Sequence, residues 1–314
     1  MERSSGGISR RDALKIGVGA GLALSLDRLP LLAQTITQGS PLLEKPIPSS
    51  GEKIPVIGMG TARFFSTVTP ELTDVIRRFP ELGGRLIDTA PAYGNAEVVV
   101  GDIIAGLKNR PKYFLATKVA VRSGERAAIV QQMEQSMQRL HTDRIDLMQI
   151  HNLAAVPETL PVLREWKQAG RFRYIGVTTS SDRQYTDFER VMGSEKLDFI
   201  QVDYAIDNRG AEERILPLAA ERGMAVLVNG PFGRSRVFQR VAGRALPDWA
   251  AEIDATSWAQ IFLKYLASHP SVTCVIPGTE KVEFLVDNMK ASHGRLPDAA
   301  LRKRIEEFYA GLAA

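Results

Sequence analysis

The chain has 314 residues, 44% of them hydrophobic and 24% charged, which is typical of a globular protein with a large buried core. Its 40 basic and 36 acidic residues give a net charge of +4 without a long basic block, so we expect no nucleic-acid partner. The single cysteine, Cys274, excludes an intramolecular disulfide. One cysteine is too few for a zinc site made of thiolates, and four histidines scattered along the chain do not indicate a multi-histidine zinc site, so we expect no metal.

The first 33 residues are predicted to be an export signal. The arginine pair in Ser9-Arg10-Arg11-Asp12 precedes an apolar, small-residue run at 16–26, too short to cross about 30 Å of hydrocarbon as a helix. This pattern resembles a twin-arginine signal, which implies recognition by the twin-arginine export machinery and a periplasmic location. Cleavage is predicted after Ala33, although Leu31 is an unfavourable residue for that site. An uncleaved leader would anchor the protein to the membrane, and a basic disordered tail is the alternative interpretation.

Eight short apolar runs recur after the leader, each followed by a segment with helical spacing. They are residues 56–58, 86–87, 113–116, 145–148, 174–177, 199–202, 225–228 and 272–276. Their centres are about 25 to 32 residues apart, the length of one βα unit, except for a last step of about 47. This order predicts an α/β protein with a (β/α)8 TIM barrel and an insertion in the seventh connection. The predicted organisation is a signal segment at 1–33, a linker at 34–44 and one barrel domain at 45–314.

A doubly wound parallel sheet is the alternative architecture, but its nucleotide-binding fingerprint is incomplete. Gly58-Met59-Gly60 would need a glycine at position 63, where Arg63 stands. The sequence also contains no phosphate-binding P-loop and no G-x-S-x-G nucleophile motif, so nucleotide triphosphatase and lipase-type activities are not predicted.

Helix-capping residues support the predicted connections. Thr69 followed by Pro70 predicts an N-cap and a first-turn proline, and Ser181 with Gln184 predicts a capping box. Apolar residues with helical spacing at 258–266 predict a further helix before the last strand.

Four ionisable residues follow three neighbouring strands: Asp88 with Tyr93, then Lys118, then His151. In a barrel the carboxyl ends of the strands meet at one rim, so these side chains should converge. A neighbouring ammonium lowers the pKa of a phenol, a carboxylate holds that ammonium, and an imidazole can hydrogen-bond a substrate oxygen. Taken singly, each residue could instead be a cap, a packing residue or a solvated strand end.

Three runs around these residues resemble the catalytic motifs of the aldo-keto reductases: 86–94 (LIDTAPAYG), 116–118 (ATK) and 146–152 (DLMQIHN). The resemblance extends over about residues 45–290, including 201–204 (QVDY) and 275–279 (VIPGT). It implies an NAD(P)H-dependent oxidoreductase that reduces a small-molecule aldehyde or ketone to an alcohol. In that reaction Tyr93 protonates the carbonyl oxygen, Lys118 lowers the pKa of Tyr93, Asp88 pairs with Lys118, and His151 orients the substrate.

The same resemblance implies a cofactor site of NADP type. Lys281, at the start of the eighth barrel helix, favours NADP, whereas the neighbouring Glu280 and Phe284 leave NAD as the alternative. Thr178-Thr179 stands where the family usually has Ser-Asn, and Asn229 where it usually has an aromatic residue. The implied cofactor-binding residues are Gly60, Thr61, Thr178, Thr179, Gln201, Asn229, Gly230, Pro231, Phe232, Gly233, Arg234, Ser235, Gly278, Thr279, Lys281 and Asn288.

Two other functions fit parts of the pattern. Lys118 at a strand end could form a Schiff base, as in an aldolase-type barrel, although Asp88 would oppose this by favouring the ammonium. A non-catalytic nicotinamide-nucleotide sensor or partner subunit would keep the cofactor site without turnover. The substrate is not encoded in these motifs, but Phe64, Phe65 and Phe232 predict an apolar rim for its pocket.

Overall fold

The computed structural model describes residues 40–312. The predicted twin-arginine signal, its cleavage site and the linker up to residue 39 lie outside the described residues. Within the described residues, no helix is both long and apolar enough to cross a membrane.

A small antiparallel hairpin precedes the barrel and was not predicted from the sequence. It pairs β1 (Glu44–Pro46) with β2 (Lys53–Pro55). Ile47 and Ile54 of this hairpin are fully buried and join the cluster of apolar side chains that fills the barrel interior. The hairpin therefore closes the amino-terminal end of the barrel, opposite the ends of the strands where polar side chains are expected.

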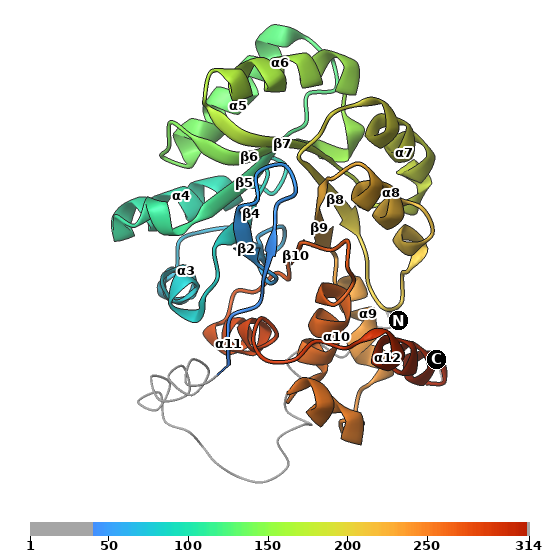
Figure 1. Cartoon of the computed structure of the whole chain (residues 1–314). Helices are drawn as coiled ribbons and strands as arrows, with labels where there is room; N and C mark the ends of the chain where they lie inside the picture. Colours follow the sequence, from blue (N-terminus) through green and yellow to red (C-terminus); the bar gives the residue numbers. More distant parts are fainter. Residues whose placement is uncertain (1–39, 313–314) are drawn as a thin grey trace, which may run out of the picture.

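Eight parallel strands form the barrel, which confirms the predicted fold (Figure 1). Each strand pairs with the next in chain order, and bridges Ile57 to Val275 and Gly60 to Gly278 join the first strand to the last. The strands are β3 (Met59–Gly60), β4 (Leu86–Asp88), β5 (Phe114–Val119), β6 (Ile145–Ile150), β7 (Phe172–Thr178), β8 (Phe199–Asp203), β9 (Ala225–Asn229) and β10 (Cys274–Val275).

The connecting helices surround the strands (Figure 1). The α-helices are α3 (Pro70–Arg78), α4 (Ala96–Leu107), α5 (Arg126–Arg139), α6 (Val156–Gln168), α7 (Tyr185–Ser194), α8 (Ile215–Glu221), α9 (Arg236–Arg240), α10 (Trp258–Ala267), α11 (Val282–Lys290) and α12 (Ala299–Ala310). Short 3-10 turns are η2 (Pro80–Leu82), η3 (Arg110–Lys112), η4 (His151–Leu153), η5 (Asp182–Gln184), η6 (Gly210–Glu212), η7 (Gly233–Ser235) and η8 (Asp248–Ile253).

The helix-start predictions had different outcomes. The Thr69 hydroxyl accepts a hydrogen bond from the Leu72 N–H at 3.1 Å, with Pro70 in the first turn, as predicted. The capping box at Ser181 was wrong, because the 3-10 turn η5 intervenes and α7 begins only at Tyr185. The predicted insertion in the seventh connection is confirmed: α9, η8 and α10 all lie between β9 and β10.

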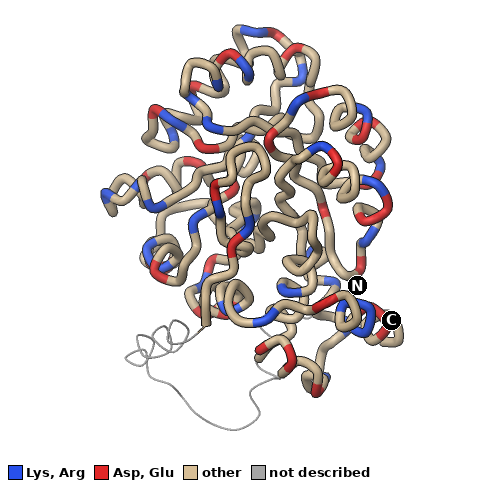
Figure 2. The backbone as a smooth tube through the Cα atoms, viewed as in Figure 1, with Lys and Arg blue, Asp and Glu red and all other residues tan. Residues whose placement is uncertain are grey.

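Burial on both faces explains why the strands read as continuous apolar runs. All six residues of β5 and of β6 are buried, because each strand contacts the barrel interior on one side and the helices on the other. Figure 2 shows the basic and acidic residues mostly on the surrounding helices and loops. Few residues of the barrel strands are charged: besides Asp88 and Lys118 they are Asp146, Arg173 and Asp203.

Candidate active site

The ends of β4, β5 and β6 position the four predicted catalytic residues at one rim. Asp88 is the last residue of β4, Lys118 is next to last in β5, and His151 directly follows β6. Tyr93 lies in the loop between β4 and α4. Parallel strands in register carry these positions to the same end of the barrel, since Asp88 pairs with Ala116 and Lys118 with Gln149.

The four side chains are close enough to act as one group. The Lys118 ammonium donates to Asp88 Oδ2 at 2.7 Å and to the Thr89 carbonyl at 3.0 Å. Its Nζ atom lies 4.9 Å from the centre of the Tyr93 ring, and the Tyr93 and His151 rings meet edge to face at 5.8 Å. We refer to Asp88, Tyr93, Lys118 and His151 as the catalytic rim.

Burial raises the pKa of Tyr93. Removal from water raises its pKa, the Lys118 ammonium lowers it, and the Asp88 carboxylate raises it again, so the pKa lies above its ordinary value. Lys118 thus lowers the Tyr93 pKa, as expected, but the increase caused by burial is larger. Tyr93 is a neutral phenol at pH 7 and keeps a proton that it can donate.

Lys118 and His151 have opposite protonation states. Burial acts to lower the pKa of Lys118, but Asp88 and Tyr93 raise it by more, so Lys118 is an ammonium at neutral pH. A Schiff base requires the free amine, and this pairing therefore disfavours the aldolase alternative. Burial, with Lys118 and Arg122, lowers the pKa of His151 to about 4, so its imidazole is neutral.

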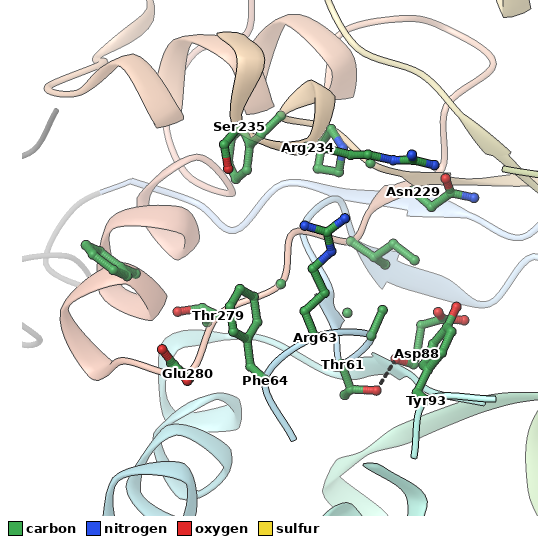
Figure 3. Close-up of a pocket in the computed structure, with 18 of the residues that line it drawn as sticks. Thr61, Arg63, Phe64, Asp88, Tyr93, Asn229, Arg234, Ser235, Thr279 and Glu280 are labelled. Atoms are coloured by element: carbon green, nitrogen blue, oxygen red, sulfur yellow. Dashed lines mark hydrogen bonds between the residues drawn. The ribbon is translucent and has the colours of Figure 1, made fainter. Parts of the chain in front are cut away.

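A pocket of about 460 Å³ begins at Asp88 and Tyr93 and continues between the β3 loop and the loop after β9 (Figure 3). Of the predicted cofactor-binding residues, the pocket is lined by Gly60, Thr61, Gln201, Asn229, Gly230, Pro231, Phe232, Arg234, Ser235, Gly278, Thr279 and Lys281. Lys118 and His151 of the rim, and Thr178, Thr179, Gly233 and Asn288 of the predicted cofactor site, do not line it.

Thr178 and Thr179 use their hydroxyls inside the protein. Thr178 Oγ1 accepts the Asn152 N–H at 3.0 Å and so supports the left-handed turn beside His151. Thr179 Oγ1 donates to the Ser181 carbonyl at 3.0 Å or to Gln184 at 2.9 Å. These contacts give both hydroxyls a local role that the sequence pattern did not indicate.

The loop after β9 forms one wall of the pocket. Gly233, Arg234 and Ser235 are consecutive residues with positive φ angles of 52°, 55° and 79°, which only glycine adopts without strain. At Gly233 a side chain would also collide with the Asp207 carboxylate. Asp207 accepts the Arg236 Nε–H at 2.9 Å, so it holds this loop from outside the pocket.

Two arginines point into the pocket from opposite walls. Figure 3 shows Arg63 rising from the β3 loop and Arg234 extending beside Asn229. Both are exposed, and neither forms an ion pair or hydrogen bond with any other residue in 40–312. Sequence reasoning missed Arg63, which it treated only as a break in a glycine pattern. Its position in the loop that follows the first barrel strand, three residues after Gly60, was the available signal. Phe64 lines the pocket as expected, whereas Phe65 is buried in the core.

The pocket residues fit a nicotinamide dinucleotide. Gln201 Nε2 donates to Asp88 Oδ2 at 3.3 Å, while its Oε1 is buried without a partner in the described chain and can accept from an amide. The two unpaired guanidinium groups suit a diphosphate. Gly278–Lys281 leads into the N-terminus of α11, where backbone N–H groups favour an anion.

These features define a barrel in which a partly buried phenol lies at one end of a pocket that carries two arginine side chains without partners among residues 40–312. The profile of the Aldo/keto reductase family matches residues 56–309. The chain belongs to this family and is an NAD(P)H-dependent oxidoreductase of carbonyl compounds.

Individual relatives agree with this assignment. Aldo-keto reductase YhdN of Bacillus subtilis is 37% identical over 206 residues, an alignment that covers 60% of this chain and 61% of the relative. Methylglyoxal reductase YeaE of Escherichia coli is 29% identical over 266 residues, covering 82% and 93%. The solved structure of an aldo-keto reductase from Klebsiella pneumoniae in complex with NADPH has a TM-score of 0.71 at 25% identity, covering 85% and 96%.

Proposed function

We propose that the protein reduces a small aldehyde or ketone with NADPH and that Tyr93 donates the proton. The observation that carries this proposal is the buried Lys118–Asp88 pair, 2.7 Å between Nζ and Oδ2, beside Tyr93 at one end of the pocket. Such an arrangement holds positive charge next to the atom that protonates a carbonyl oxygen.

The rim residues have separate tasks in this reaction. The bound cofactor supplies the hydride. Tyr93 gives its phenolic proton to the carbonyl oxygen on which negative charge develops. Lys118 stabilises the tyrosinate that remains, and Asp88 keeps the ammonium in place. Neutral His151 donates a hydrogen bond to the same oxygen and so orients the carbonyl without competing as an acid.

The proposed cofactor contacts follow the length of the pocket. Gln201 Oε1 accepts from the nicotinamide amide, Arg63 and Arg234 bind the diphosphate, and Lys281 binds the 2'-phosphate. Lys281 supports NADPH over NADH, and Glu280 beside it weakens this preference by charge repulsion.

The proposed substrates are small 2-oxoaldehydes and related reactive aldehydes. This follows from the relatives that are methylglyoxal reductases. Phe64, Phe232 and Phe238 give the pocket an apolar surface that suits a small organic carbonyl compound.

Fluorescence titration with NADPH and NADH, followed by addition of methylglyoxal or an aromatic aldehyde, tests the proposal. We expect tighter binding of NADPH and loss of its absorbance on addition of the carbonyl compound. Tight binding without oxidation across a broad panel of aldehydes and ketones would instead support the sensor or partner-subunit function. Binding of neither nucleotide would overturn the proposed cofactor site.

We further propose that the protein is exported to the periplasm by the twin-arginine route with its cofactor already bound, because that route carries folded proteins. The support is the Ser9-Arg10-Arg11-Asp12 run before an apolar segment. Replacing Arg10 and Arg11 with lysine should keep the protein in the cytoplasm, as measured by cell fractionation. Export that is unaffected by this change would contradict the proposal, and recovery in the membrane fraction would indicate an uncleaved anchor.

A further inference from the structure

The Asp88 carboxylate is held from two sides by buried glutamine amides. Gln149 Nε2 donates to Asp88 Oδ1 at 3.3 Å, and Gln201 Nε2 donates to Asp88 Oδ2 at 3.3 Å. A carboxylate only accepts hydrogen bonds, so the nitrogen of each amide faces it. Gln201 belongs to the proposed cofactor site, whereas neither the sequence motifs nor the catalytic rim gave a role to Gln149.

Gln149 lies where packing alone would favour an apolar side chain. It is fully buried in β6, with apolar residues Leu147, Met148 and Ile150 as its neighbours along the strand. Its Oε1 is buried with no hydrogen-bond partner in the described chain. An unpaired buried polar atom is destabilising, so a leucine of similar size would be the more stable choice if Gln149 only filled space.

The strand register places Gln149 beside the catalytic lysine. Lys118 of β5 pairs with Gln149 of β6, and both donate to the same carboxylate. The two oxygens of the Asp88 carboxylate have different donors. Oδ1 accepts a hydrogen bond from the Gln149 amide, and Oδ2 accepts from Lys118 and Gln201. The hydrogen bond from Gln149 to Oδ1 hinders rotation of the Asp88 carboxyl group and draws part of its negative charge toward the amide.

We propose that Gln149 is a positioning residue for carbonyl reduction: its amide fixes and partly neutralises the Asp88 carboxylate, so that Lys118 remains directed toward Tyr93. This inference rests on the proposed role of Tyr93 as the proton donor. Without the Gln149 amide, Asp88 carries more concentrated charge, attracts the ammonium more strongly and exerts a larger field on the phenol. Both changes make Tyr93 a weaker acid, since Asp88 raises and Lys118 lowers its pKa.

Gln149→Met tests this role, because methionine has a similar shape and cannot donate a hydrogen bond. Gln260→Met is the matched control: Gln260 is equally buried and donates to the Asp287 carboxylate at 2.8 Å, away from the catalytic rim. The first readout is a pH titration of the full-length, cofactor-free protein labelled with carbon-13 at the tyrosine Cζ, with Tyr93→Phe assigning the resonance. The second is the pH dependence of kcat/KM.

We expect Gln149→Met to raise the Tyr93 pKa by about half a unit to one unit and to move the alkaline limb of kcat/KM equally, with kcat reduced about three- to tenfold. The NADPH dissociation constant should stay within about twofold, and Gln260→Met should move neither pH readout. An unchanged or lowered Tyr93 pKa in a folded Gln149→Met protein overturns the inference. If that variant does not fold, Gln149→Leu gives the same comparison. Because the titration needs no turnover, an inactive protein in which the resonance still shifts would contradict the proposed function but not the linkage between Gln149 and Tyr93.

Discussion

The catalytic rim differs from the part of the pocket between the β3 loop and the loop after β9, which we call the cofactor groove, in how the protein holds its charges. In the rim, Lys118 is 1% exposed and paired with Asp88, which is 2% exposed. In the groove, Arg63 and Arg234 are exposed and have no partner among residues 40–312. The rim is therefore assembled during folding, whereas the groove obtains its counter-charges from the ligand. Changes in the rim should alter chemistry or stability, and changes in the groove should alter affinity.

Tyr93→Phe separates chemistry from binding most sharply. The phenylalanine keeps the ring against His151 and removes the proposed proton donor, so kcat should fall by about 10²- to 10⁴-fold. The NADPH dissociation constant, measured by fluorescence titration, should change by less than about threefold. Equal losses of turnover and of cofactor affinity would mean that Tyr93 acts in binding instead.

Lys118→Met tests whether the rim is part of the folded core. The change leaves Asp88 buried without its cation, and breaking such a pair costs about 3–5 kcal/mol. Urea denaturation should show this loss in the free energy of unfolding. The control is Arg126→Ala, which removes an ion pair with Glu165 whose side chains are both 58% exposed and should cost less than about 1 kcal/mol. Equal losses of unfolding free energy in the two variants would contradict the predicted difference between the buried and the exposed ion pair.

His151 makes the free energy of unfolding depend on pH. Its pKa of about 4 in the folded protein lies below the ordinary value of 6.5, so the unfolded chain binds the proton more tightly. The free energy of unfolding should therefore fall as the pH decreases from about 6.5 toward 4. For this partly exposed side chain the loss at pH 5 is on the order of 1–2 kcal/mol.

Comparison of His151→Gln with the wild type by urea denaturation between pH 7 and 5 measures this contribution. The variant should lose less stability on acidification. Partly buried His269, whose pKa is also lowered to about 4, still makes its own contribution to the pH dependence. His141→Gln, at a half-exposed position paired with Asp102 and away from the rim, shows what the same substitution does elsewhere in the chain. Identical slopes for His151→Gln and the wild type would show that His151 is not buried as a neutral imidazole.

Arg234→Ala should have the smallest effect and should affect only affinity. Removing one charge-assisted contact to a phosphate weakens NADPH binding by about tenfold, or about 1.4 kcal/mol, and the loss should shrink at high salt. Arg244→Ala, an exposed arginine of the same connection that does not line the pocket, should leave binding unchanged. The distinction between rim and groove would be wrong if Arg234→Ala lowered the free energy of unfolding, or if Arg244→Ala weakened NADPH binding as much as Arg234→Ala does.

Local sequence patterns predicted much of this fold because each depends on neighbouring residues. Apolar runs located the eight barrel strands, and the Thr69 cap depends only on a contact three residues away. Features that depend on distant contacts were missed or wrong. The β1–β2 hairpin is stabilised by burial of Ile47 and Ile54 against the barrel interior. At Ser181 the predicted box does not form, and the Gln184 amide instead donates to the Asn152 carbonyl, 32 positions away in the chain.

The sequence by itself determined which ionisable residues end the strands, because a polar residue after a buried apolar run is visible in the chain. Only the tertiary structure decided which partners these residues have. Gln149 reaches Asp88 across 61 positions and Gln201 across 113, contacts that exist only once the strands lie side by side. Packing also raises the pKa of Tyr93, lowers that of His151 to about 4 and places Arg63 at the wall of the pocket.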